Sequence, residues 1–146
     1  MRYKIVTDNN LNIPEELKSD LRIEKITADK NCQYPSDYEK AFDSEAEMII
    51  VLASSDSIGN SYSTAVAGRR MYLDGLKRQG MAKKKIFVLD YESALAKTED
   101  IVTLAFKSCE KGLSFGDTCL DLMFSYNKIK VVNNLATFAA ICPAGA

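Results

Sequence analysis

Short apolar runs recur along the chain and are separated by longer segments in which apolar residues follow a helical spacing. Runs of this length, rich in Ile, Val and Leu and bounded by polar turns, are typical of strands buried in a parallel sheet. The pattern predicts strands at Tyr3–Thr7, Ile23–Thr27, Met48–Ala53, Lys85–Leu89 and Lys128–Asn133.

The segments between these runs place apolar residues three and four positions apart, which predicts amphipathic helices. The predicted helices are Pro14–Leu21, a helix that begins at Pro35 and buries Tyr38, Ala41 and Phe42, Ser61–Gln79, Thr98–Lys111, Ser114–Tyr126, and a last one over Leu135–Ile141. The expected inward faces are Tyr62, Ala65, Val66, Tyr72, Leu73 and Leu76 on the third helix, Ile101, Val102, Ala105, Phe106 and Cys109 on the fourth, and Phe115, Cys119, Leu122, Met123 and Tyr126 on the fifth.

Strands that alternate with helices in this way form a parallel or mostly parallel sheet with helices on both faces. In such a sheet, the loops that follow the strands open at one end and form the usual ligand site. The loops concerned are Asp8–Asn10, Ser54–Ser61, Asp90–Ser93 and Asn133–Asn134. Their polar residues predict a ligand site, although a domain that binds no ligand would also carry polar loop tips.

The loop Ser54–Tyr62 carries most of the candidate chemistry, because it joins an apolar strand to a helix through serines, a glycine and an asparagine. A helix start offers unpaired backbone N–H groups and the positive end of the helix dipole, which favour an anion. The sequence therefore predicts a ligand that bears a carboxylate or a phosphate.

Composition excludes several other classes of function. The 146 residues suffice for one domain, and a net charge of −1 is unlike that of a nucleic-acid binder. No apolar run is long enough to span a membrane, and the amino terminus has no signal-peptide pattern, so we expect a cytoplasmic protein. Four cysteines show no metal-binding spacing, and Cys109 and Cys119 fit as reduced core residues.

Histidine is absent, which removes the commonest general base and the commonest metal ligand. The chain also lacks both Gly-rich nucleotide motifs, and no base is evident that would activate Ser61. We therefore expect that the chain is not an enzyme and that it binds neither a cofactor nor a metal ion.

Several motifs, in the correct order along the whole chain, resemble the DegV family of bacterial fatty-acid-binding proteins. Lys4–Asn9 with the following Ile13–Glu16 is similar to that family's K-I-V-T-D-S start and L-P-x-E helix, and Ser54–Ala65 is similar to its S-S-x-L-S-G-T-Y-x-x-A loop. Phe87–Asp90 and Lys111–Ser114 resemble a V-I-D-S strand end and a later G-x-S-x-E-E segment. Asn31–Ser36 resembles its T-S-Q-P-S element.

This resemblance implies a Rossmann-like three-layer α/β sandwich that binds a fatty acid or another carboxylate and catalyses no reaction alone. The implied ligand residues are Asn31, Ser55, Ser57, Gly59, Asn60 and Ser61, with Thr7, Asp8 and Asp90 at the margin of the site. Two carboxylates beside a carboxylate ligand are unfavourable, so we interpret Asp8 and Asp90 first as residues that organise the loops. A separate fatty-acid kinase is the implied partner.

The chain departs from the family pattern at three places. Asn31 and Cys32 replace the family's Thr and Ser, and Gly59 stands where a hydroxyl would contact the carboxylate. We expect residues 1–146 to form a single domain without the family's second, lipid-covering domain, and a homodimer could restore the missing cover. The alternative is a degenerate module that has lost lipid binding and acts through self-association or a protein partner.

Overall fold

The computed structural model describes residues 2–26, 34–56, 60–81, 84–92 and 98–141, with side chains described as far as residue 130 apart from those of 98 and 99. Its strands are β1 (Tyr3–Thr7), β2 (Ile23–Lys25), β3 (Met48–Ala53) and β4 (Lys85–Asp90). Its helices are the short 3₁₀ turn η1 (Glu15–Leu17), α1 (Pro35–Phe42), α2 (Ser61–Arg78), α3 (Thr98–Glu110) and α4 (Phe115–Ile141).

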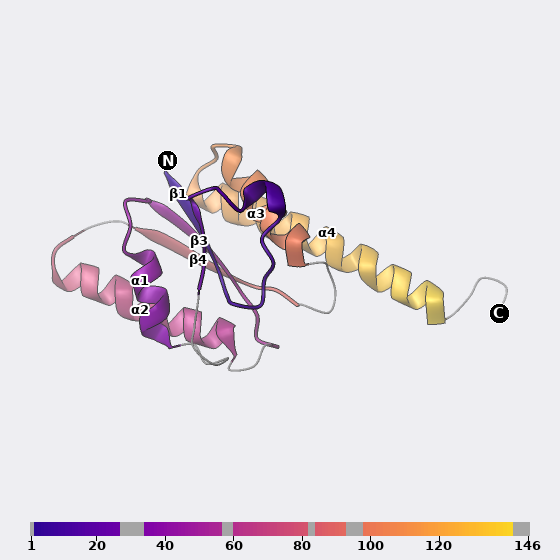
Figure 1. Ribbon diagram of the computed structural model, residues 1–146, viewed down its shortest axis with the longest axis horizontal. Coiled ribbons are helices and arrows are strands. Elements are labelled where there is room, and N and C mark those ends of the chain that lie inside the picture. Colours follow the sequence, from indigo (N-terminus) through magenta and orange to yellow (C-terminus); the bar gives the residue numbers. More distant parts are fainter. Residues whose placement is uncertain (1, 27–33, 57–59, 82–83, 93–97, 142–146) are drawn as a thin grey trace.

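The four strands form one parallel sheet in the order β2-β1-β3-β4. Helices α1 and α2 cover one face, and α3 with α4 covers the other (Figure 1). The predicted three-layer α/β sandwich is therefore confirmed. Because successive side chains of a strand point to opposite faces, Ile5 and Ile50 join the core under α3 and α4, whereas Val6 and Val51 join the core under α1 and α2.

Helices α1 and α2 pack closely because α2 carries a glycine at their contact. A Cβ atom on Gly68 would lie 2.8 Å from the carbonyl oxygen of Pro35 and 3.0 Å from the Cβ of Tyr38. This contact fixes the start of α1 beside α2. The tight packing brings Tyr38 and Phe42 fully into the core.

The prediction of a last strand at Lys128–Asn133 is wrong, because these residues lie inside α4. The segment is rich in β-branched residues, but no Gly or Pro interrupts the chain between Gly116 and Ile141. Extending an existing helix costs less than nucleating a new element, so the helix continues through it. Asn133 and Asn134 consequently do not belong to a loop at the end of a strand.

Smaller differences concern element lengths and exposed positions. The predicted helix Pro14–Leu21 is only the turn η1, and β2 ends at Lys25 rather than Thr27. Val66 and Met123, expected on inward faces, are exposed to 38% and 41%.

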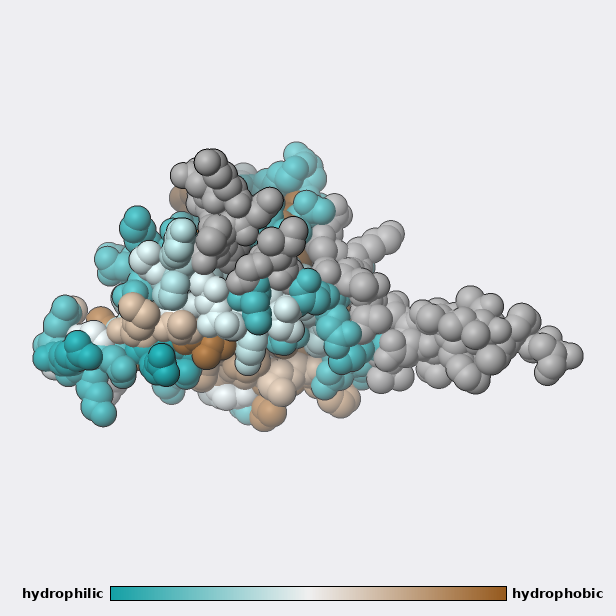
Figure 2. All heavy atoms as spheres, turned by 90° about the horizontal axis from the view of Figure 1, so that it is seen from below, coloured by the Kyte–Doolittle hydropathy of each residue, from teal (hydrophilic) through white to brown (hydrophobic). Residues whose placement is uncertain are grey.

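Seen from below, the surface is mostly hydrophilic, with hydrophobic colour in patches (Figure 2).

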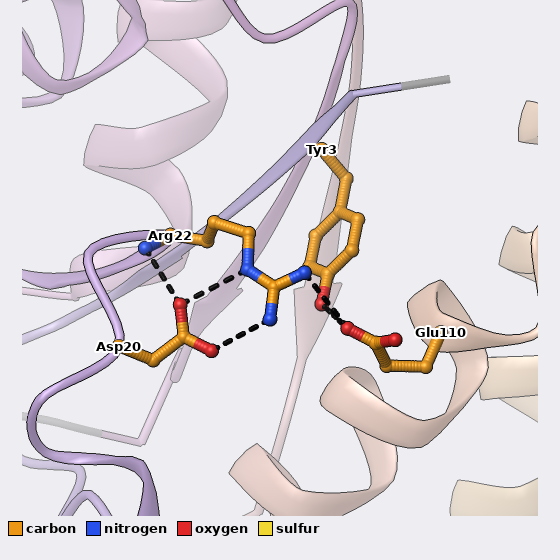
Figure 3. A network of polar contacts seen from close by, with 4 residues as sticks. All are labelled: Tyr3, Asp20, Arg22 and Glu110. Carbon is orange, nitrogen blue, oxygen red and sulfur yellow. Dashed lines mark hydrogen bonds and ion pairs between the residues drawn. The ribbon is translucent and has the colours of Figure 1, made fainter.

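At the amino ends of the strands, an exposed polar network ties the chain before β2 to the end of α3 (Figure 3). The Arg22 guanidinium donates to both oxygens of Asp20, at 3.0 and 2.8 Å, and to Glu110 at 2.8 Å. The Tyr3 hydroxyl donates to the same Glu110 oxygen at 2.5 Å. The guanidinium also lies 4.8 Å from the centre of the Tyr3 ring, a cation–π distance.

Candidate functional site at the carboxyl end of the sheet

The polar residues that follow β1, β3 and β4 meet at the carboxyl end of the sheet. Thr7 and Asp8 close β1, Ser54 and Ser55 follow β3, and Asp90 is the last residue of β4. The parallel register brings them together, because Thr7 pairs with Leu52 and Ala53 pairs with Asp90. Three of the four loops predicted to share this end therefore do so.

Asp8 is the centre of this arrangement and is fully buried. Its carboxylate accepts hydrogen bonds from the Tyr91 hydroxyl at 2.7 Å and from the backbone N–H groups of Ser54 at 3.1 Å and Asn10 at 3.2 Å. Burial raises the pKa of Asp8, and these donors together with the Ser61 hydroxyl oppose that rise. Asp8 thus holds together the loops that follow β1, β3 and β4.

In the turn after β3, the backbone N–H groups of Ser55 and Asp56 donate to other groups of the chain. The N–H of Ser55 donates to Asp90 at 2.9 Å, and the N–H of Asp56 donates to the Ser54 hydroxyl at 3.1 Å. The Ser54 hydroxyl in turn contacts the Asp56 carboxylate. The interpretation of Asp8 and Asp90 as loop-organising residues agrees with these contacts, because each accepts a backbone N–H of this turn.

At the start of α2, two backbone N–H groups also donate to other groups of the chain. Asn60 adopts a left-handed conformation with φ of 49°, and its side chain accepts from the N–H of Ser63 at 3.1 Å. The N–H of Tyr62 donates to the carbonyl oxygen of Ser54 at 3.1 Å. The expectation that free N–H groups at this helix start bind the ligand is therefore wrong for these two donors, because a capping side chain and a loop carbonyl already occupy them.

Ser61 lies inside the protein rather than at its surface. Its side chain is 1% exposed and hydrogen-bonds both Asp8 and Tyr38. Asn60 and Ser55 are exposed at the same end of the sheet. Asn31, Ser57 and Gly59 lie outside the described residues, so their assignment to the site stays a prediction.

Thr7 carries the unsatisfied hydroxyl of this end. Its side chain is fully buried, and within the described ranges its Oγ1 is the one buried side-chain nitrogen or oxygen without a hydrogen-bond partner. Such a group costs about 1 to 3 kcal/mol relative to a satisfied one. An unsatisfied buried donor beside a predicted ligand site is the feature expected of a group that forms a hydrogen bond with a bound ligand.

A small hollow with two lysines lies next to Thr7 along the sheet. Lys25 is the register partner of Thr7 on β2, and it lines a hollow of about 290 Å³ with Asn12, Ile13 and Lys18. Lys18 pairs with Glu15 at 2.8 Å, whereas among the described residues Lys25 has no ion pair. This hollow supplies positive charge at an end of the sheet that is otherwise acidic.

Tyr91 and Tyr38 are structural members of the site that the sequence did not reveal. Tyr91 is fully buried, and burial followed by the nearby Asp8 charge raises its pKa strongly, so its hydroxyl stays a donor. Tyr126 of α4 accepts the N–H of Glu92 at 2.7 Å, which fixes the loop after β4 from the other layer. A tyrosine after an apolar strand gives no signal that its hydroxyl reaches a carboxylate 83 residues away.

Within the described residues, no group of three His, Cys, Asp or Glu side chains is placed to hold a metal ion. None of the helices in the described part is both long and apolar enough to cross a membrane.

The sheet order, its parallel strands and the loops gathered at their carboxyl ends define a Rossmann-like α/β domain of the kind that binds small ligands there. No protein-family model and no curated protein matches the chain in sequence. Solved structures do match it, with the fold of the DegV fatty-acid-binding proteins over most of the chain.

A DegV-family protein from Ruminococcus gnavus, solved with vaccenic acid, superposes with a TM-score of 0.67 at 20% identity, over 86% of this chain and 55% of that one. The B3 protein of the Streptococcus pneumoniae fatty acid kinase, loaded with linoleic acid, gives 0.61 at 18% identity, over 84% and 53%. A DegV-family protein from Thermus thermophilus, described for its fatty-acid binding, gives 0.63 at 15% identity, over 89% and 54%. The chain therefore spans about half the length of these proteins.

Proposed function

We propose that this chain binds the carboxylate of a fatty acid at the carboxyl end of its sheet, in the cytoplasm, and catalyses no reaction by itself. The observation that carries the proposal is the buried Thr7 hydroxyl, which has no hydrogen-bond partner among the described residues and lies at the end of the sheet where the fold places ligands. The likeness in fold to proteins solved with fatty acids supports a carboxylate ligand.

The donors left for a head group are few, and they define the proposed site. Thr7 offers its hydroxyl, Ser55 is exposed, and Lys25 offers an ammonium group. A charged donor and two hydroxyls suffice to offset the desolvation of one carboxylate. Asn31, Ser57, Gly59, Asn60 and Ser61 remain the proposed neighbours of the head group, with Asp8 and Asp90 as loop supports.

The test measures how much a fatty acid raises the melting temperature of the delipidated full chain. Oleate should stabilise the wild type through mass action, whereas methyl oleate, which has no carboxylate, should not. Mass spectrometry of the purified protein should find a co-purified fatty acid. If no lipid co-purifies and oleate leaves the melting temperature unchanged, the proposal is wrong.

Two buried threonines allow a matched comparison within this test. Thr7→Val removes a hydroxyl without a partner, so the ligand-free variant should be as stable as the wild type or more stable, while the stabilisation by oleate is lost. Thr118 is equally buried, but its hydroxyl donates to the carbonyl oxygen of Leu113 at 3.4 Å. Thr118→Val should lower stability and leave the response to oleate intact, and identical responses of the two variants would contradict the assignment of Thr7.

A second candidate function is an interaction module that has lost lipid binding. The specific observation in its favour is that Asp8, Asp90 and Asn60 already occupy the backbone donors of the loop after β3. In this case oleate leaves the wild type unchanged, and Thr7→Val stabilises it. The B3 neighbour belongs to a fatty acid kinase, so in the first case a separate kinase is the proposed partner.

A further inference from the structure

The outer face of α4 exposes three large apolar side chains in a row. Leu120 and Phe124 are exposed to 65% and 64%, and Met123 to 41%. With Leu113, Asp117, Asp121 and Asn127, they line a shallow hollow of about 710 Å³. Single exposed apolar residues are ordinary, but neighbouring exposed apolar residues on one helix face mark an interaction surface.

Opposite charges stand at the two ends of this apolar row. Asp117 precedes it and Lys128 follows it, and both are exposed. Asp117, Leu120, Phe124 and Lys128 follow a spacing of three, four and four residues, which places them along one stripe of the helix.

No other described residue forms an ion pair with either of these charges. Among the described residues, Asp121 pairs with Lys111 and Lys130 pairs with Glu92, whereas Asp117 and Lys128 form no ion pair. The Lys128 ammonium lies over the Phe124 ring, 4.7 Å from its centre. Two unpaired opposite charges thus flank the apolar row on the same face.

This face is complementary to itself under a two-fold rotation. Asp117 and Lys128 are equally distant from the point between Leu122 and Met123, about 8 Å each at a rise of about 1.5 Å per residue. When two copies of the helix pair antiparallel about this point, Asp117 of each copy faces Lys128 of the other. The same pairing brings Leu120 of each copy next to Phe124 of the other, so the apolar contacts and the ion pairs form together.

We propose that α4 is the interface of a symmetric homodimer, in which two α4 helices pair antiparallel through Leu120, Met123 and Phe124 with reciprocal Asp117–Lys128 ion pairs. A contact of one helix face is small, so the dimer is weak and depends on concentration. This inference stands independently of fatty-acid binding, since Leu120, Met123 and Phe124 are exposed on the outer face of α4, whereas Tyr126 and Lys130 contact Glu92 after β4.

Sedimentation of the full chain over a concentration series tests the apolar part. The wild type should pass from monomer to dimer, and Phe124→Glu should raise the dissociation constant about thirtyfold or more, as at a central interface residue. The matched control is Met71→Glu, which places the same charge on an apolar residue of α2 that is 50% exposed and should leave the dimer unchanged. A wild type that stays monomeric at millimolar concentration, or a Phe124→Glu variant that still dimerises normally, overturns the proposal.

Charge reversal tests the orientation of the two helices. Asp117→Lys and Lys128→Asp should each weaken the homodimer severalfold, because each brings like charges together across the axis. Mixing the two variants should restore association as a heterodimer, since every facing pair is then again opposite in sign. Asp74→Lys, a reversal on the exposed side of α2, should have no effect. If the mixture associates no better than the separate variants, the antiparallel pairing is wrong.

Discussion

Two polar networks at opposite ends of the sheet use similar groups in different ways. At the carboxyl end, the buried Asp8 accepts from a tyrosine hydroxyl and backbone N–H groups, and no cation takes part in the hydrogen bonds described for it. At the amino end, Asp20 and Glu110 pair with Arg22 in contact with solvent. The comparison teaches that burial decides the importance of a carboxylate here, because only the buried one leaves unsatisfied partners when it is removed.

The largest effect should come from removing the buried carboxylate. Asp8→Ala leaves the Tyr91 hydroxyl and the N–H of Ser54 buried without an acceptor, so we expect the free energy of unfolding to fall by about 3 to 5 kcal/mol. Urea unfolding followed by circular dichroism measures this loss. Asp20→Ala is the matched control, and an equal loss in both variants would contradict the proposed difference between the two ends.

A smaller effect should follow from removing one donor to Asp8. Tyr91→Phe keeps the buried ring and deletes the hydroxyl that lies 2.7 Å from the carboxylate, at an expected cost of about 2 kcal/mol. Because this donor lowers the pKa of Asp8, its loss should raise that pKa further above the ordinary value. A carbon-detected NMR titration of the Asp8 carboxyl group measures the shift, and an unchanged titration would show that Tyr91 does not donate to Asp8.

The sequence predicted the buried strands and helices of the molecule much better than its hydrogen bonds. Met48–Ala53 was predicted with its correct bounds because a continuous apolar run between polar turns has no other stable place than the centre of a sheet. The segment Lys128–Asn133 failed because its β-branched residues favour a strand locally, while the uninterrupted helix before it decides the outcome.

The candidate site shows the same limit. The sequence placed Thr7, Asp8, Ser55, Asn60, Ser61 and Asp90 at one end of the sheet, since this follows from topology alone. It could not show that Asn60 and Ser54 occupy the donors at the start of α2, or that Ser61 turns inward to Asp8. The contact between Ser61 and Asp8 joins residues that are far apart in the chain, so local spacing carries no signal for it.

At the amino end, removal of the cation should cost much less than loss of Asp8. Arg22→Met keeps an aliphatic side chain against Tyr3 and removes the ion pairs, so we expect a loss of about 1 kcal/mol, typical of an exposed network. The loss should shrink at high salt, because solvent-exposed charges are screened. Urea unfolding at low and high sodium chloride measures both values. A loss that is large and independent of salt would place this network in the same class as the Asp8 network.

The smallest effect is the opposite response of the two ends to pH. Asp20 has a pKa below its ordinary 3.8 because Arg22 hydrogen-bonds it, so its stabilising contribution is present above that ordinary value and is lost as the pH falls through the lower folded-state pKa. Burial raises the pKa of Asp8, so its contribution is greatest below the ordinary value and is lost as the pH rises through the folded-state pKa. The difference in unfolding free energy between the wild type and Asp20→Asn should therefore stay constant near neutral pH, decrease as the pH falls past the ordinary 3.8, and vanish only below the lower folded-state pKa of Asp20. Over the same range, the Asp8 resonance should titrate above 3.8. An Asp8 that titrates below that value would show that the pKa values of both carboxylates are lowered, and would contradict the expected difference between the two ends.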